Sequence, residues 1–193
     1  MIPAVEAYKW RDDPLLASNF IAPYNERFDN FSQNVLGGVD LNDGSQGRMV
    51  KIWNISYDRL NSLVSIKPED GNVALTMTIY DIRSLSLSFD NNMSPVVAYK
   101  KDDGCYIYYF NTLTNLFVTR AFPGVTECRT FVDDSRDFYN TNSDVFFVYT
   151  LNNKLYYRQQ RDRYDIEYFI GDTNRILRRA GPSVEYRVQI ELI

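Results

Sequence analysis

The chain has no histidine among its 193 residues. Histidine is the commonest general base near neutral pH and the commonest side-chain metal ligand, so its absence argues against most hydrolytic and metal-dependent chemistry. The sequence also lacks GxSxG, GxxxxGK(S/T) and GxGxxG, the motifs of nucleophile elbows and phosphate-binding loops. Its paired aspartates do not have the spacing of a calcium loop. We therefore predict no catalytic residues, no metal site, no cofactor and no enzymatic activity.

Cysteine is scarce, with only Cys105 and Cys128 in the chain. Their spacing fits neither a metal site nor a redox motif, so we expect two buried free thiols, with a disulfide as the alternative. No run of about 18 apolar residues is present, which predicts no membrane-spanning helix. The N-terminal residues lack the basic start and the apolar segment of a signal peptide. We expect synthesis in a cytoplasm, and a location elsewhere only if an assembly carries the protein there.

An excess of charge of one sign is also missing, because 21 basic and 25 acidic side chains give a formal charge of −4. This balance gives no electrostatic reason to expect contact with nucleic acid. Hydrophobic residues make up 45% of the chain, which is enough to bury a sizeable core. The 15 tyrosines and 12 phenylalanines favour strand surfaces and interfaces over helices.

What the sequence does contain is an internal repeat. Residues 95–110 reappear as residues 145–159 after a shift of 50 positions, which matches Tyr99 to Tyr149. Upstream the shift is 44, so the second copy has six additional residues near 135–140. A period near 50 with turn residues inside each copy is typical of antiparallel blade-like units, as in β-propellers. A related hairpin signal 33 positions before the first copy indicates a degenerate third unit in front.

Alternating apolar and polar residues between turn signals predict about thirteen strands. In the two clear copies they are residues 85–90, 95–101, 104–111 and 115–122, then 128–133, 144–151, 154–160 and 164–170. Further strands are predicted at 49–57, 63–66, 73–80, 174–179 and 184–192. Residues 85–89 alternate strictly between apolar residues and serine, which predicts a strand with one buried face.

One short helix is predicted at residues 25–36. Phe28, Phe31 and Val35 would lie on one helical face, and Gly37 could adopt the left-handed conformation that ends a helix. A helix this short would need a surface to pack on.

The predicted fold class is all-β, with repeated antiparallel blade-like units that are propeller-like or stacked as a sandwich. An irregular N-terminal arm with the short helix is assigned to residues 1–40, and the β-repeat domain to residues 41–193. Two or three blades cannot close a ring within one chain, since closed propellers have about four to eight. Open sheet edges invite pairing with other chains, so we expect a homo-oligomer or a larger assembly.

Two groups of residues are candidates for contacts with a partner protein. They are Tyr8, Trp10, Phe20 and Tyr24 in the proline-interrupted arm, and Tyr156, Tyr157, Arg158, Arg161 and Arg163 in the second repeat copy. The arm is expected either to lie over the β domain as a strap or to pack on a neighbouring subunit. In the second group, Asp162, Asp165 and Glu167 balance the arginines, which favours a self-neutralising edge between subunits over a stacking platform for nucleic acid.

Several segments resemble a β-repeat module of virion proteins from tailed bacteriophages. They are residues 84–90, 94–99, 133–134, 143–149, 154–168, 175–181 and 187–191. The most specific is the string Leu155-Tyr-Tyr-Arg-Gln-Gln-Arg-Asp-Arg163, and the resemblance covers about residues 80–193. It implies a structural component of a phage neck or tail, present in several copies, with no catalytic residues to carry over.

Two functions are therefore expected from the sequence. The first is a structural subunit of a tailed-phage virion, made in the host cytoplasm, that contacts other virion structural proteins in an oligomeric assembly. The alternative is a receptor-binding module of the tail that recognises a host-surface glycan through aromatic faces and arginines.

Overall fold

The computed structural model describes residues 30–40, 48–68, 71–90, 94–132, 144–175, 177–182 and 188–192. These residues form fourteen strands and one short 3-10 helix. The strands are β1 (Asn30–Asp40), β2 (Arg48–Asp58), β3 (Leu63–Pro68), β4 (Leu75–Thr78), β5 (Ser84–Phe89), β6 (Pro95–Lys101), β7 (Gly104–Asn111), β8 (Leu116–Pro123), β9 (Glu127–Val132), β10 (Val145–Leu151), β11 (Lys154–Gln159), β12 (Tyr168–Asp172), β13 (Leu177–Pro182) and β14 (Val188–Leu192). The 3-10 helix η1 spans Gln160–Asp162.

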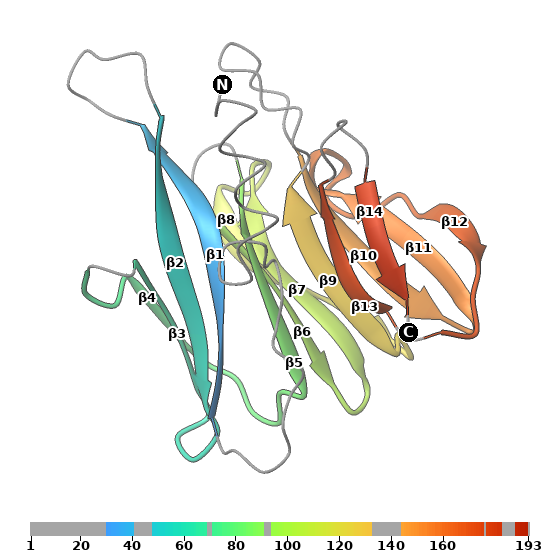
Figure 1. Ribbon diagram of the computed structural model, residues 1–193, viewed down its shortest axis with the longest axis horizontal. Coiled ribbons are helices and arrows are strands. Elements are labelled where there is room, and N and C mark those ends of the chain that lie inside the picture. The colour runs from blue at the N-terminus through green and yellow to red at the C-terminus, as the bar shows by residue number, and fades with distance from the viewer. Residues whose placement is uncertain are drawn as a thin grey trace.

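The described strands form three four-stranded sheets and one two-stranded sheet, all with consecutive antiparallel neighbours (Figure 1). The first sheet is β1–β4, the second β5–β8 and the third β9–β12, while β13 and β14 pair with each other. The all-β class and the repeated four-stranded units are confirmed. The second and third sheets are the two clear repeat copies, and the first sheet is the degenerate unit expected in front of them.

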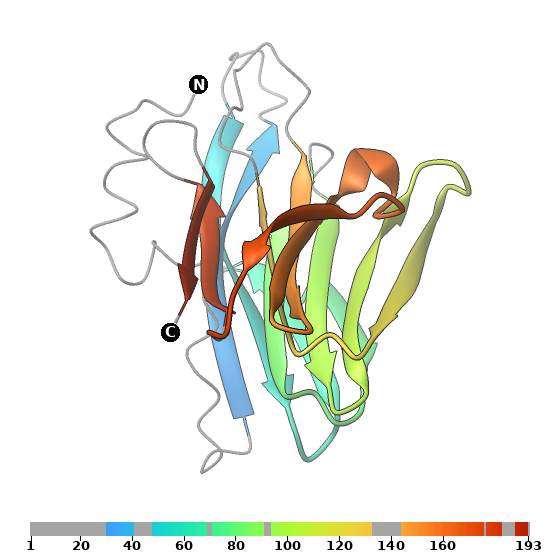
Figure 2. The same ribbon diagram turned by 90° about the vertical axis from the view of Figure 1, so that its right-hand side faces the viewer.

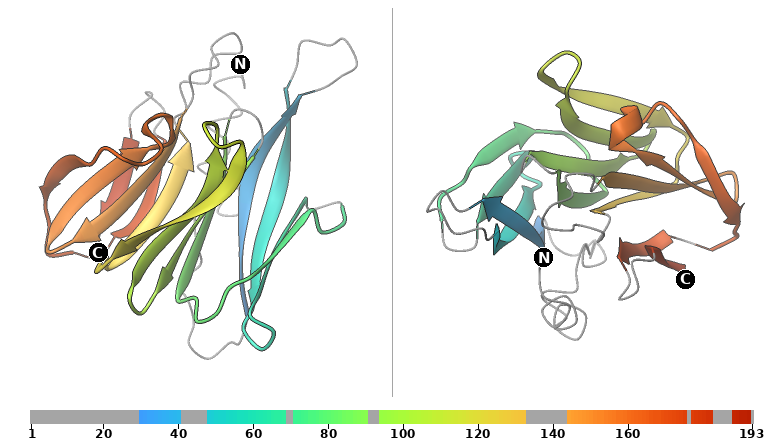
Figure 3. Two further views of the ribbon diagram at one scale, coloured as in Figure 1. Left: turned by 180° about the vertical axis from the view of Figure 1, so that it is seen from behind. Right: turned by 90° about the horizontal axis from the view of Figure 1, so that it is seen from above.

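The first strands of successive units pack against one another, β1 against β5, β5 against β9 and β9 against β13. This is the arrangement of neighbouring blades, in which each sheet packs face to face on the next. The described sheets follow one another in an open arc and do not close into a ring (Figure 3). Figure 2 shows the third sheet between the β13–β14 pair, in red, and the second sheet, in green.

Each interface between sheets contains its own hydrophobic core. The first core lies between the first and second sheets, the second between the second and third sheets, and the third between the third sheet and β13–β14. Because successive side chains of a strand point to opposite faces, β6 contributes Val97 and Tyr99 to the first core and Val96 and Ala98 to the second. The middle sheets are therefore buried on both faces.

The serine face of β5 is buried too, whereas the sequence predicted a single buried face. The side chain of Ser86 is fully buried, and its Oγ accepts the backbone N–H of Thr130 at 3.0 Å. Ser88 Oγ donates to Thr130 Oγ1 at 3.1 Å, and Ser84 Oγ donates to the Glu127 carboxylate at 2.9 Å. Small hydroxyl side chains allow the inner strands β5 and β9 to approach closely, and each of these three serine hydroxyls has a hydrogen-bond partner.

The predicted helix at 25–36 is wrong for residues 30–36, which belong to β1; residues 25–29 lie outside the described residues. The eleven residues of β1 pair with β2 in unbroken antiparallel register from Asn30↔Asp58 to Asp40↔Arg48. Phe31 and Val35 are four positions apart, so they share a face in a strand as well as in a helix, and the apolar pattern did not distinguish the two. Pairing along a long neighbouring strand outweighs the propensity of a short helix. The first sheet therefore begins at Asn30, within the range assigned to the arm.

Most other strand boundaries in the described residues agree with the sequence prediction within two residues, with two exceptions. The predicted strand at 164–170 begins only at Tyr168, because residues 160–167 form η1 and a compact loop. The strand predicted at 174–179 is shifted along the chain and spans Leu177–Pro182. Residues 184–187 of the last predicted strand lie outside the described residues, and residues 188–192 form β14. The hairpin turn at Asn152 and Asn153 has φ angles of 51° and 59°, which asparagine tolerates better than most residues.

Candidate partner-binding surface

The four aromatic candidates of the arm, Tyr8, Trp10, Phe20 and Tyr24, lie outside the described residues. The five candidates of the second repeat copy are all described. They are contributed by β11, by η1 and by the loop that leads to β12.

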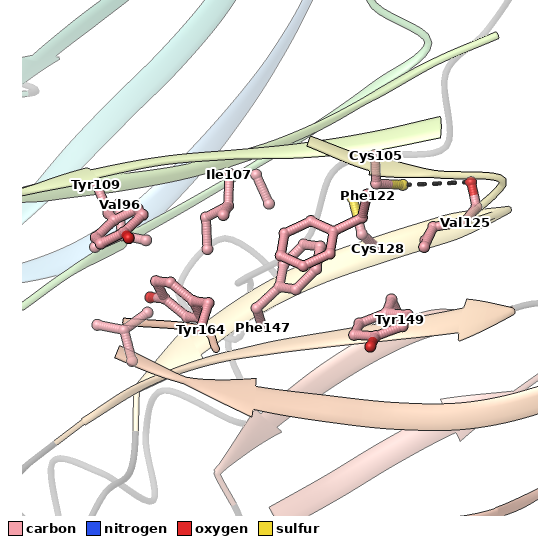
Figure 4. Packing of buried hydrophobic residues seen from close by; sticks show 12 residues of the cluster. Val96, Cys105, Ile107, Tyr109, Phe122, Val125, Cys128, Phe147, Tyr149 and Tyr164 are labelled. Atoms are coloured by element: carbon pink, nitrogen blue, oxygen red, sulfur yellow. Dashed lines mark hydrogen bonds between the residues drawn. The ribbon is translucent and has the colours of Figure 1, made fainter. Parts of the chain in front are cut away.

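The loop after β11 is held by its own backbone and by one buried side chain. The backbone N–H of Arg163 donates to Gln160 O at 2.7 Å, and that of Tyr164 to Gln159 O at 2.9 Å. Arg163 and Tyr164 have φ angles of 54° and 60°, a left-handed pair that reverses the chain. As a result the Tyr164 ring points into the second core, where its exposed fraction is 0% and it packs edge-on against Tyr109 at 4.9 Å between ring centroids (Figure 4).

Arg158 fastens this loop to the third sheet from within the molecule. Its guanidinium donates to the backbone carbonyls of Tyr164 at 2.9 Å and of Asp165 at 2.7 Å. It also donates to the Tyr149 hydroxyl at 3.0 Å and pairs with the Glu167 carboxylate at 3.0 Å. The exposed fraction of its side chain is 15%, and the guanidinium lies 5.2 Å from the centroid of the Phe122 ring. Arg158 is a structural tie whose donors already have acceptors.

The Tyr149 hydroxyl is part of the same network, because it also donates a short hydrogen bond to the Glu167 carboxylate. Burial, and then this hydrogen bond, raise the pKa of Tyr149 above its usual value. Tyr149 therefore stays protonated as a donor to Glu167 across the whole physiological range.

Arg120 fastens the loop to the second sheet. Its guanidinium donates to the backbone carbonyl of Arg163 at 3.1 Å and forms an ion pair with the Asp165 carboxylate. The hydrogen bond from Arg120 holds the pKa of Asp165 below its usual range. Together Arg120, Arg158, Asp165 and Glu167 form what we call the arginine clasp, which connects two neighbouring sheets over the second core.

The remaining two arginines are more exposed and pair with nearby carboxylates. Arg161 Nε lies 3.0 Å from the Asp144 carboxylate, and the backbone N–H of Arg161 donates to the same group at 3.1 Å. Burial raises the pKa of Asp144, and the contacts with Arg161 partly oppose that effect. Arg163 pairs with Asp165 at 3.4 Å. The self-neutralisation that the sequence predicted is present, and the structure shows it within a single chain.

Tyr156 and Tyr157 point to opposite faces of the third sheet. Tyr156 packs next to the second core, 5.7 Å from the Phe169 ring. Tyr157 packs next to the third core and stacks on Tyr168, with ring centroids 4.8 Å apart. The structure thus brings Arg158 and Arg163 together at the loop, but it does not combine the two tyrosines and the arginines into one surface.

Sequence reasoning missed the apolar residues on the outer strands. On β12 and just before it, Ile166, Phe169 and Ile170 are exposed, with 57% for Phe169. At β8 and the turn before it, Leu113, Leu116 and Phe117 are exposed. The signal that could have identified them is position, because each residue lies just before or within the fourth strand of a repeat unit. By contrast, the outward face of β4 carries Thr76 and Thr78.

Among the described strands, the last unit has two, where each preceding unit has four. In Figure 1, β13 and β14 lie in front of β9–β11, and no described strand covers β12 on that side. Ile190 and Leu192 of β14 pack on the third core beside Tyr157. The outer edge of β14 has no partner strand among the described residues. Tyr157, which packs on the same core as Ile190 and Leu192, and Tyr168, which stacks on Tyr157, are both half-buried.

Within the described ranges, no group of three or more metal-ligating side chains is close enough together to hold an ion. The described residues include no helix long and apolar enough to cross a membrane. Comparisons of the chain with models of protein families, with curated proteins and with solved structures found no match.

Proposed function

We propose that this protein is a structural subunit of a tailed-phage particle, in the neck or tail, where it contacts neighbouring subunits through the edges of its sheets. The proposal combines the resemblance of residues 80–193 to phage virion proteins with the arrangement of the sheets. It needs no catalytic site, and its surface acts by pairing and packing.

The incomplete last unit is the observation that carries the proposal. In the part of the chain that the structure describes, a two-stranded sheet at the end of a row of four-stranded sheets leaves a strand edge and part of a neighbouring face without a covering strand. Unpaired backbone groups at such an edge pair readily with a strand from another chain. A strand added to β14 would lie over Tyr157 and Tyr168, which are already stacked and partly buried.

The exposed apolar residues of β8 and β12 support the same conclusion. Edge strands of monomeric proteins are usually protected by charges, prolines or bulges. Here Phe169 and Ile170 in β12, and Leu116 and Phe117 in β8, remain exposed on outer strands. Apolar residues of this kind gathered at sheet edges are typical of contact surfaces between proteins.

The first test is the mass of the purified protein by light scattering at several concentrations. An assembly whose mass is a multiple of the 22.6 kDa chain supports the proposal. A monomer at all concentrations, which also fails to bind any particle protein from the same virion, contradicts it.

A pair of matched variants locates the contact. Tyr168→Lys introduces a charge beside the open edge of β14, whereas Tyr80→Lys makes the same change at a tyrosine that is 63% exposed between β4 and β5. We expect Tyr168→Lys to weaken assembly at least tenfold in dissociation constant, and Tyr80→Lys to leave it unchanged. Near-ultraviolet circular dichroism of both variants checks that the fold is intact. Equal effects of the two variants would contradict a contact at this edge.

A third test concerns the arm. We expect removal of residues 2–24 to abolish incorporation into particles while the β domain still folds. Incorporation is measured by probing purified particles for the protein, with the full-length chain as the control. Normal incorporation without the arm would show that these residues make no essential contact.

A further inference from the structure

The two cysteines meet across the interface between the second and third sheets. Cys105 is the second residue of β7, and Cys128 is the second residue of β9. Both are free thiols, with exposed fractions of 0% and 1%, and both belong to the second core. Figure 4 shows them side by side between the two sheets.

The pair lies at the end of the core, under the connection between β8 and β9. The Cys105 thiol donates to the backbone carbonyl of Val125 in that connection, at 3.8 Å from sulfur to oxygen. Gly124 and Thr126, on either side of Val125, are exposed. Cys105 itself follows Gly104, where a Cβ atom would lie 2.4 Å from the Phe122 carbonyl oxygen, so the backbone of β7 is held close to β8 at this point. A short opening of the connection would therefore expose both sulfur atoms together.

We propose that Cys105 and Cys128 are an oxidation site at which a disulfide forms between the second and third sheets when the folded protein meets a disulfide oxidant. One cysteine, as the thiolate, attacks a sulfur of a low-molecular-weight disulfide such as oxidised glutathione and releases one glutathione thiol. The second cysteine then attacks the resulting mixed disulfide and releases the second glutathione thiol. The two cysteines lose two electrons and two protons in total, and the oxidised glutathione gains them.

The burial of the pair determines how fast this reaction proceeds. Burial raises the pKa of the Cys128 thiol, so little thiolate is present near neutral pH. The pair is therefore stable as free thiols in a reducing cytoplasm and reacts slowly elsewhere, at a rate limited by opening of the connection. We expect the rate to rise with pH and with low concentrations of urea that leave the fold intact.

The new bond would join strands that belong to different sheets. It would close the chain from Cys105 to Cys128 and lock the face-to-face packing of two repeat units. Because such a bond reduces the conformational entropy of the unfolded chain, we expect the Tm of the oxidised protein to rise by roughly 5 to 10 °C.

The experiment incubates the full chain with oxidised glutathione below its unfolding temperature, then alkylates the free thiols and maps the peptides without reduction. The expected result is one linked pair of peptides that contains Cys105 and Cys128, with a higher Tm that reverts on reduction. The variants Cys105→Ala and Cys128→Ala are the controls, and each should form no such link and show no shift in Tm.

Three results would overturn the proposal. They are two freely alkylated cysteines after prolonged oxidation, a mixed disulfide with glutathione as the final product, and a link between two chains.

A comparison with the urea-unfolded chain makes the test specific to the folded state. In the unfolded chain the two thiols are far apart on average, so the intramolecular link should form with a lower yield relative to glutathione adducts. These results are independent of whether the protein is a virion subunit.

Discussion

The second and third sheets are copies of one sequence unit, and their described residues differ clearly in the connection between the third and fourth strands. In the second sheet this connection is a short turn that leaves Leu113 71% exposed. In the third sheet it is η1 and the loop to β12, which places Tyr164 in the second core. The strands of a repeat are therefore interchangeable in this fold, while the connections are specialised for what lies next to each copy.

The reason for the difference lies in the neighbouring residues. The loop of the third sheet faces Arg120 of the second sheet, which donates to its backbone and pairs with Asp165. The same loop also accepts hydrogen bonds from Arg158 of its own sheet. The turn of the second sheet is held only by local hydrogen bonds, such as that from the Leu113 N–H to Asn111 Oδ1 at 3.0 Å. One connection became part of a core, and the other stayed at the surface.

The largest expected effect of this difference comes from Tyr164→Ala. Removal of a fully buried aromatic side chain leaves a cavity in the second core and should lower the free energy of unfolding by about 3 to 5 kcal/mol. Leu113→Ala in the matching connection should change it by less than about 0.5 kcal/mol. Urea unfolding followed by fluorescence measures both, and similar values for the two variants would refute the contrast. Tyr164→Phe should be close to neutral, because the Tyr164 hydroxyl has no hydrogen-bond partner among the described atoms.

The next largest effect is expected for Arg158→Ala. This change removes the Arg158 donors from two backbone carbonyls and leaves the Glu167 carboxylate with only the Tyr149 hydroxyl as donor, so it should lower the free energy of unfolding by about 2 to 3 kcal/mol. Arg158→Lys should recover only part of the loss, because an ammonium group cannot reach all of these acceptors at once. Hydrogen exchange should show faster exchange in residues 164–167 and no change in the turn at 111–115. Equal acceleration in both connections would mean that Arg158 does not act on the loop.

A smaller effect is expected at the inner strands, where equivalent positions of the two copies touch. Ser86 and Thr130 are related by the shift of 44 and hydrogen-bond to each other. Ser86→Ala removes the acceptor of the Thr130 N–H and should lower the free energy of unfolding by about 1 to 2 kcal/mol. Ser65→Ala, on a half-buried position of β3, is the control and should have little effect. If Ser86→Ala and Ser65→Ala change the free energy of unfolding equally, the hydroxyl contact between Ser86 and Thr130 does not stabilise the packing of the two copies.

The smallest effect concerns pH. The pKa of Asp165 is lowered in the folded state, so its stabilising contribution is present above the unfolded value of about 4 and is lost as the pH falls through the folded pKa. The difference in unfolding free energy between the native protein and Asp165→Asn should therefore be largest near neutral pH and shrink in acid. Urea unfolding at several pH values measures this difference. Arg120→Gln is measured alongside, because it removes the ion-pair partner of Asp165. Because Asp144 has a raised pKa, Asp144→Asn should show a pH dependence of opposite sign.

The arginines show where reasoning from sequence succeeded and where it stopped. The balance of Arg158 and Arg163 with Asp165 and Glu167 was visible in the sequence, and the ion pairs exist. The sequence did not show that Arg120 belongs to the same network, because Arg120 lies on β8, 45 positions before Asp165. The sequence also gave no sign that Arg158 would be largely buried, since an arginine next to tyrosines fits an exposed edge equally well.

By itself the sequence determined the repeat, the strands and most of the turns, because these depend on local patterns with a period of two and on turn residues such as Asn152 and Asn153. Only the tertiary structure decided which strand faces are covered, as the buried serines of β5 and the strand β1 in place of a helix demonstrate. A pattern of apolar residues shows that a face must be covered, but the covering residues belong to a neighbouring sheet and lie 44 to 54 positions away in the chain. The same physical reason applies to the last unit, since nothing in the pattern of β13 and β14 states which strand pairs with the outer edge that the described residues leave without a partner.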